Sequence, residues 1–345
     1  SQNYTHTCSY MKKGSSALYY INLKVGVFIL LLTAAALKTA TAGDMNPEKV
    51  QVNLLLKGST VSGSLSSIVI PLKQAGRLFL IEARIDDQEG NLIFDTGATG
   101  LVLNRTYFRK YAAYEKPGAG GITGNFSKVH GTIVKEVDAS GFFYEKVAAD
   151  MADLGHIEDK RGVKILGLFG MKMIDDMEVI FDAAANQMIL VHIDGDGNRT
   201  GTGDDLPQFD FRQKIETHYK IMLVRGKIGD KSLNFCLDTG AEINALHRNV
   251  SKKVMETVQI SRRAPVGGAS SQSSEVLYGI MNELELGSYR FGSMGTVIMD
   301  LTAMGEAYGC TIEGMLGYDF WMKGVYSFNF RKKEIGFSVR KEGRQ

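Results

Sequence analysis

Asp95-Thr96-Gly97-Ala98 and Asp238-Thr239-Gly240-Ala241 are two copies of one four-residue phrase, and they decide the fold of this chain. Each copy follows an apolar run, Leu92-Ile93-Phe94 in one case and Phe235-Cys236-Leu237 in the other. The pattern places each carboxylate at the end of a buried strand, where an acid is costly unless it is paired or used. Two such acids predict one site built by two matching halves, in which two carboxyl groups share one proton.

The surroundings of the two phrases repeat at the same offset of 143 residues. Identical residues recur upstream of each phrase: Ile85 with Ile228, Asp87 with Asp230, and Asn91 with Asn234. Further downstream the offset becomes 147, and it aligns Gly167 and Gly170 with Gly314 and Gly317. The chain is therefore a tandem duplication, with a repeat far longer than a solenoid unit.

Strands dominate the coarse secondary structure. Residues 78–85 and 220–228 are apolar-rich runs that end in turn residues, which predicts a hairpin in each half. Later hairpins are expected from 179–181 with 188–191 and from 326–330 with 335–339. Short helices are expected at 106–114, near 250–257, and after each late glycine.

The N-terminus has the features of an export signal. Met11-Lys12-Lys13 is a short basic start, residues 25–37 are almost all apolar, and Ala40-Thr41-Ala42 suits cleavage before Gly43. An uncleaved anchor is the alternative, although this run is shorter than the about 20 residues of a membrane span. We expect an exported protein, periplasmic, surface-attached or secreted.

Composition indicates an ordinary globular protein, with 44% hydrophobic and 23% charged residues. Residues 43–345 carry 36 basic and 38 acidic side chains, so the basic face that nucleic acid requires is not expected. We expect five segments: signal peptide or anchor 1–42, N-terminal extension 43–66, first lobe 67–191, linker 192–208 and second lobe 209–345. The linker contains Asp194, Asp196 and Asn198, but Arg199 and Asp205 do not fit the sixth and twelfth positions of a calcium-binding loop.

The two motifs together resemble aspartic proteases of the pepsin–retropepsin type, specifically bacterial exported members with two retropepsin-like halves. In each half the Asp-Thr-Gly-Ala phrase is followed by a hydrophobic-hydrophobic-glycine segment, Leu168-Phe169-Gly170 or Met315-Leu316-Gly317. The resemblance covers residues 67–191 and 209–340. It implies an all-β, bilobal acid-protease (pepsin-like) fold made of two duplicated retropepsin-like β-barrel halves.

The resemblance also implies roles for these residues. Asp95 and Asp238 would be catalytic, activating a water by general acid and base chemistry without cofactor, metal or covalent intermediate. The residues that would support the active-site loops are Thr96, Gly97, Thr239, Gly240, Gly170 and Gly317. Two glycine-rich segments resemble substrate-covering flaps and contain Gly120, Gly121, Gly267 and Gly268; an ordinary mobile loop leading into a strand is the alternative. Glu242, at the position where retropepsins carry an aspartate used in an ion pair, would be structural.

The sequence thus predicts a monomeric aspartic-type endopeptidase acting on peptides or proteins, with membrane contact only through an uncleaved N-terminus. The alternative is a catalytically inactive peptide-binding module of the same fold. Loop-capping aspartates in a degenerate β module fit less well, because neither copy has lost its aspartate or glycine. No GxSxG, HExxH or P-loop is present, and the six histidines lack metal-ligand spacing. Cys236 and Cys310 remain after removal of the signal, and their pairing stays open.

Overall fold

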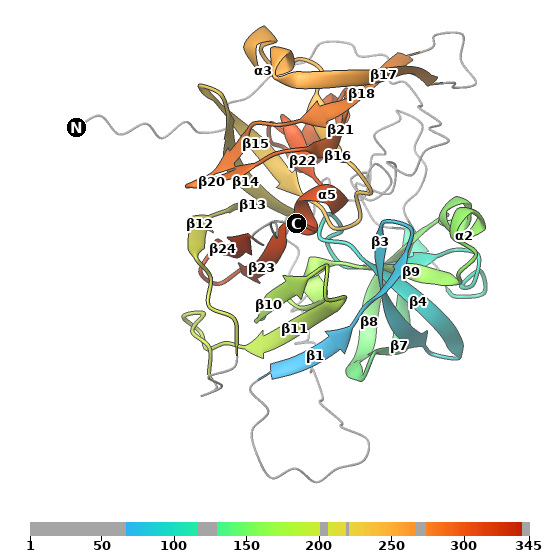
Figure 1. The fold of residues 1–345 in the computed structure, drawn as a ribbon. Helices are drawn as coiled ribbons and strands as arrows, with labels where there is room; N and C mark the ends of the chain where they lie inside the picture. Colours follow the sequence, from blue (N-terminus) through green and yellow to red (C-terminus); the bar gives the residue numbers. More distant parts are fainter. Residues whose placement is uncertain are drawn as a thin grey trace.

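The computed structural model of the chain describes residues 67–112, 114–115, 130–200, 206–218, 221–266 and 274–339. The expected signal or anchor, the N-terminal extension and all four flap glycines lie outside these ranges. No helix within the described ranges has the length and apolar character of a membrane span. The fold is all-β and bilobal, as the sequence predicts (Figure 1).

The first lobe is one eight-stranded sheet in the order β2-β3-β4-β9-β5-β8-β7-β6. The strands β4 and β9 run parallel to each other, as do β5 and β8. The elements are β2 (Lys73–Ala75), β3 (Leu78–Ile85), β4 (Gln88–Phe94), β5 (Leu101–Asn104), β6 (Tyr114–Glu115), β7 (His130–Ala139), β8 (Phe142–Ala152), α2 (Gly155–Arg161), β9 (Ile165–Phe169) and the 3-10 helix η2 (Met171–Met173).

The second lobe repeats the path of the first. Its strands β14-β15-β22-β16-β21-β18-β17 follow the same order as β3-β4-β9-β5-β8-β7-β6, which confirms the duplication in three dimensions. The elements are β13 (Glu216–His218), β14 (Ile221–Ile228), β15 (Lys231–Leu237), β16 (Asn244–His247), α3 (Lys252–Glu256), β17 (Val258–Val266), β18 (Ser274–Met281), β19 (Leu284–Leu286), β20 (Tyr289–Phe291), β21 (Met294–Met299), α4 (Thr302–Tyr308), β22 (Gly314–Leu316) and α5 (Tyr318–Trp321).

A six-stranded antiparallel sheet joins the two lobes, at the lower left of Figure 1. In the order β1-β11-β10-β23-β24-β12, the first three strands come from the first half of the chain and the last three from the second half. At its centre Ile180 pairs with Ser327, its own equivalent at the offset of 147, so the pseudo-two-fold axis passes through this pair. The strands are β1 (Ser67–Pro71), β10 (Met177–Asp182), β11 (Gln187–His192), β12 (Phe211–Lys214), β23 (Gly324–Asn329) and β24 (Glu334–Val339).

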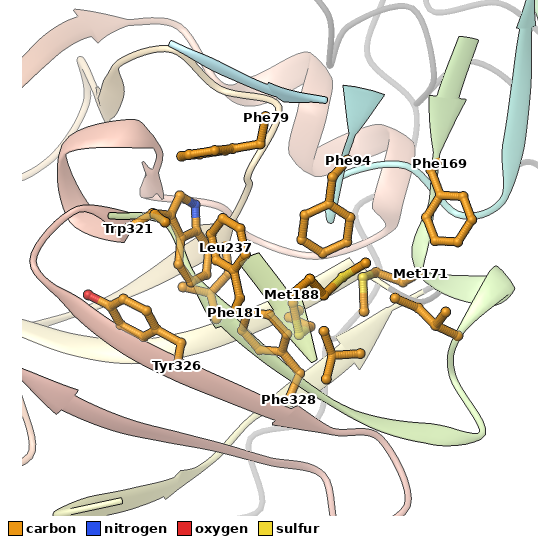
Figure 2. Packing of buried hydrophobic residues seen from close by; sticks show 14 of the residues in the cluster. Phe79, Phe94, Phe169, Met171, Phe181, Met188, Leu237, Trp321, Tyr326 and Phe328 are labelled. Atoms are coloured by element: carbon orange, nitrogen blue, oxygen red, sulfur yellow. The ribbon is translucent and has the colours of Figure 1, made fainter. Parts of the chain in front are cut away.

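One hydrophobic core runs from the joining sheet into both lobes (Figure 2). Phe181 lies at its centre, with its ring edge-on to Phe79 at 5.0 Å and to Trp321 at 5.7 Å between centroids. Phe94 and Leu237, which directly precede the two aspartates, are fully buried in this same core. Burial of so much continuous apolar surface fixes the lobes to each other beneath the two loops.

The expected hairpins in both halves are confirmed, and so are the helix near 250–257 and a short helix after each late glycine. The helix expected at 106–114 is wrong. That segment forms isolated turns, in which the backbone N–H of Tyr107 donates to the Asn104 carbonyl and that of Tyr111 to the Phe108 carbonyl. Tertiary contacts of its side chains stabilise these turns in place of a helix: Phe108 is buried, and the hydroxyl of Tyr111 donates to Asp86 Oδ2 at 2.7 Å.

The expected linker is held against the joining sheet by one buried ion pair. Arg199 donates from Nε and Nη2 to the two carboxylate oxygens of Glu178, each at 2.9 Å. The Glu178 side chain on β10 is only 3% exposed. Asn329, on the neighbouring strand, donates to the Gly197 carbonyl at 2.8 Å.

Replacement of Arg199 by alanine should lower the free energy of unfolding by about 3 kcal/mol, because it leaves the Glu178 carboxylate buried without its cation. Denaturant unfolding at neutral pH measures this. Lys73→Ala is the matched control, since Lys73 pairs with Glu82 while both side chains are more than half exposed, and it should cost no more than about 1 kcal/mol. Equal costs for the two variants would contradict this account of the linker.

Candidate active site

The two aspartates stand at equivalent places where a central strand of each lobe ends. Asp95 follows β4 and Asp238 follows β15, and neither side chain is exposed to solvent. In each loop the aspartate Oδ1 accepts a hydrogen bond from the backbone N–H two residues on, at 2.8 Å, from Gly97 or Gly240. The other oxygen, Oδ2, is buried in both carboxyl groups and has no hydrogen-bond partner among the described residues.

Reciprocal hydrogen bonds between the two threonines lock the loops together. The N–H of Thr96 donates to Thr239 Oγ1 and the N–H of Thr239 donates to Thr96 Oγ1, both at 3.0 Å. Each hydroxyl then donates across the axis to the carbonyl before the opposite aspartate, Leu237 at 2.9 Å and Phe94 at 2.7 Å. All four bonds are buried, so the two loops form one rigid unit.

Glycine is required where this unit is tightest. A Cβ on Gly240 would lie 2.8 Å from Asp95 Cγ, which shows how closely the first carboxyl group approaches the opposite loop. A Cβ on Gly170 would lie 2.5 Å from the Gly100 carbonyl oxygen, and one on Gly317 would lie 2.5 Å from that of Ala241. The two hydrophobic-hydrophobic-glycine segments therefore pass directly beside the loops, where no side chain fits.

Burial shifts both carboxyl groups toward the neutral form. Desolvation raises the pKa of Asp95 to about 6. The pKa of Asp238 is raised well above its ordinary value, first by burial and then by the negative charge of Asp95. When a coupled pair of carboxyl groups has lost its first proton, one group is ionised and the other is protonated. The pair can then act as one base and one acid.

Two aromatic side chains that the sequence analysis did not single out also hold these loops. Trp321 of α5 donates from its ring nitrogen to the Asp238 carbonyl at 3.0 Å. Tyr308 of α4 donates its hydroxyl across the lobes to the Gly97 carbonyl, also at 3.0 Å. Trp321 is the one tryptophan of the chain, and it lies four residues after Gly317. That position could have identified it, because a buried tryptophan usually donates its ring N–H to a nearby acceptor.

Glu242, for which a structural role is expected, forms an ion pair between the lobes. Its carboxylate pairs with Arg161 at the end of α2, and both side chains are less than one-fifth exposed. Its backbone carbonyl accepts from Nη1 of Arg77 at 3.2 Å. Both arginines belong to the first lobe, so Glu242 attaches the loop that follows Asp238 to it.

The glycine-rich segments expected to be flaps connect antiparallel strands in both lobes. The first lies between β6 and β7 and the second between β17 and β18. Cys236 is fully buried against the same cluster that Cys310 contacts, and the two are not joined in a disulfide. Across the described ranges, no three His, Cys, Asp or Glu side chains gather where they could hold a metal ion.

Comparison with known proteins adds one family match. The family model described as aspartyl protease matches residues 81–173 and 224–320, together more than half of the chain, and each segment contains one Asp-Thr-Gly-Ala phrase. No curated protein matches the sequence. Among the matching solved structures is basic 7S globulin from soybean, with a TM-score of 0.44 and 9% identity, over 80% of this chain and 95% of that one.

Thr239→Val should destabilise the protein by about 2 to 4 kcal/mol, because the Thr96 N–H and the Phe94 carbonyl then lose their buried partner. Thr239→Ser keeps the hydroxyl and should cost less than half as much. Chemical denaturation of the two variants tests this. If valine were tolerated as well as serine, the loops would not depend on the reciprocal bonds.

Stability should fall as the pH rises from about 4 to about 6. Because the pKa of Asp95 is about 6 in the folded chain and 3.8 ordinarily, its stabilising contribution is complete below 3.8 and is lost as pH rises through the folded value. Asp95→Asn should flatten this part of the curve of unfolding free energy against pH. Asp87→Asn, at an exposed turn of the same lobe, should leave the fall in place. A fall that survives Asp95→Asn would contradict the assignment.

Proposed function

The chain belongs to the aspartyl protease family, and we propose that it is an endopeptidase whose single active site is completed by its own two halves. The observation that carries this proposal is the pair of buried carboxyl groups, Asp95 and Asp238, fixed by the cross-axis threonine bonds while each keeps one oxygen without a protein partner. A buried carboxyl oxygen with no donor is unfavourable in a purely structural role. It is what a dyad needs in order to hold a water and a substrate carbonyl.

The two carboxyl groups would divide the chemistry. One member of the pair would be ionised and would take a proton from the attacking water. The other would keep its proton and donate it in a hydrogen bond to the scissile carbonyl oxygen as charge develops there. The dyad then holds two protons, its own and the one taken from the water. One of them passes to the leaving amine, and the dyad returns to its singly protonated state. No covalent intermediate with the protein is needed.

An extended peptide would lie across the two loops and be covered by the glycine-rich segments. Support comes from the hairpin stems, since β6 with β7 and β17 with β18 lead into these segments in the two lobes. Backbone pairing with an extended substrate gives affinity, and pockets for alternate side chains give specificity. Because both halves are in one chain, a monomer would suffice. Export remains part of the proposal and rests on the N-terminal sequence alone, while a bacterial source rests on the resemblance of the two motifs.

Cleavage of a mixed peptide library should fall by at least about a hundredfold in Asp95→Asn and equally in Asp238→Asn, because each substitution removes one member of the acid–base pair. Mass spectrometry of the products over a range of pH measures this. Asp87→Asn is the matched control and should cleave as the wild type does.

Two results would contradict the proposal. Cleavage that survives either dyad substitution would place the chemistry elsewhere. A folded wild-type chain that binds library peptides and cleaves none at any pH would instead favour a catalytically inactive peptide-binding module.

A further inference from the structure

The two halves of the site differ in one polar connection that reaches from the first lobe to the second catalytic loop. Arg77, in the turn before β3, donates from Nη1 to Asp319 Oδ1 at 3.0 Å. Asp319 lies in α5, two residues after Gly317. The same guanidinium lies over the ring of Tyr318, 5.2 Å from its centroid. The first lobe thus binds the segment beside the second catalytic loop through a cation.

From Asp319 the connection continues into the second lobe. Asp319 Oδ2 accepts from the N–H of Gly295 at 2.7 Å, and the carbonyl of Gly295 accepts from Asn244 Nδ2 at 3.0 Å. Asn244 Oδ1 in turn accepts from the N–H of Gly317 at 2.8 Å. Asn244 is fully buried, so both ends of its amide are used in the protein interior.

Gly317 is the residue through which this connection reaches the dyad. It packs against the Asp238 loop so closely that a Cβ would meet the Ala241 carbonyl oxygen. The preceding carbonyl, of Leu316, accepts the N–H of Asp238 itself at 3.0 Å. Gly295 is equally constrained, because a Cβ there would lie 2.8 Å from Asp319 Oδ2. A shift of Asp319 would therefore be transmitted to the segment that supports Asp238.

The first half lacks the side chains that make this connection. The residues equivalent to Asn244, Gly295 and Asp319 by the two offsets are Leu101, Ala148 and Lys172, and none of these side chains is an acceptor. Duplication has kept the catalytic phrase in both halves and placed these polar residues in one. This difference is not needed to close the fold, since the first lobe has the same strand order without it.

We propose that Arg77, Asp319 and Asn244 are positioning residues, which hold the second catalytic loop so that Asp238 stands correctly opposite Asp95. This inference rests on the proposed function for its kinetic meaning, and the geometry it describes is independent of activity. Arg77 is 47% exposed, so its ion pair alone is weak. Its effect comes from joining a network that passes through the partly buried Asp319 and Gly295 and ends at the buried Asn244 and Gly317.

Four variants test the connection at successive points: Arg77→Ala, Asp319→Ala, Gly295→Ala and Asn244→Asp. Each should lower kcat by at least about fivefold while KM changes by less than about twofold, because the loss falls on the reacting groups. Arg77→Lys should recover most of the activity, since a single nitrogen of the guanidinium makes both of its hydrogen bonds. Arg248→Ala is the matched control: it removes a 2.7 Å pair with Asp300 on the same lobe and should leave kcat unchanged.

A second readout does not require activity. Titration of the Asp95 and Asp238 carboxyl carbons by NMR, assigned with the two Asp→Asn variants, should give apparent pKa values that move in Asn244→Asp and Gly295→Ala and stay in Arg248→Ala. Asn244→Asp keeps an acceptor for Gly317 but replaces the donor to the Gly295 carbonyl by a buried carboxyl oxygen. Arg77→Ala changes a side chain that is 47% exposed, so it is the variant with the best prospect of folding normally.

The outcomes separate the two proposals. A wild type that cleaves nothing, with a dyad titration that moves in these variants, would reject the endopeptidase and keep the positioning role. A wild type that cleaves, with kcat and titration the same as in Arg248→Ala for all four variants, would overturn the positioning role. Lower melting temperatures without either change would overturn it too, because they would show that these contacts only stabilise the fold.

Discussion

The reciprocal bonds between Thr96 and Thr239 are the constraint on which the rest of this structure depends. Two carboxyl groups repel each other as they ionise, and each would gain by moving into solvent. The threonines prevent this, because each satisfies the backbone of the opposite loop and neither loop can move without leaving buried groups unpaired. Beneath them, the core around Phe181 and the joining sheet hold the two strands that end in the aspartates. The strand order, the glycines and the core all serve to bring these two loops together at the axis.

Symmetry ends a short distance from that axis. The threonine bonds and the pairing of β10 with β23 are related by the duplication, whereas the polar contacts that Glu242 and Tyr308 make between the lobes differ in chemistry. On one side, Glu242 of the second lobe attaches to two arginines of the first; on the other, Tyr308 reaches back to the Gly97 carbonyl. A duplicated gene can diverge in this way because each half needs to fit only its partner. Inequivalent surroundings also allow two chemically identical carboxyl groups to take different roles.

Much of this arrangement could be predicted from the sequence, because its central feature is a repeat. The two Asp-Thr-Gly-Ala phrases predict where the two central strands end. The two later glycines predict the segments that pack directly beside the loops, and the repeat as a whole predicts the all-β class. The sequence did not reveal what depends on contacts between distant residues. Arg77 and Asp319 have no local pattern that marks them as partners, and their 242 residues of separation are bridged only by the fold. The helix predicted at 106–114 is absent for the same reason, because Phe108 and Tyr111 make contacts with distant residues that hold the segment in turns. The lengths of the two halves also differ here. The second half is four residues longer between Arg248 and Gly267 than the first between Arg105 and Gly120, and it has room for α3 where the first half has turns.

The central claim is that one chain builds one dyad from its two halves, and the stoichiometry of transition-state binding tests it most directly. Calorimetric titration of the purified chain with a statine-type transition-state mimic, with its mass in solution determined by sedimentation, should give one mimic per monomer. Asp95→Asn and Asp238→Asn should each weaken that binding by a similar, large factor. One mimic per two chains, or binding that responds to only one of the two aspartates, would contradict the account.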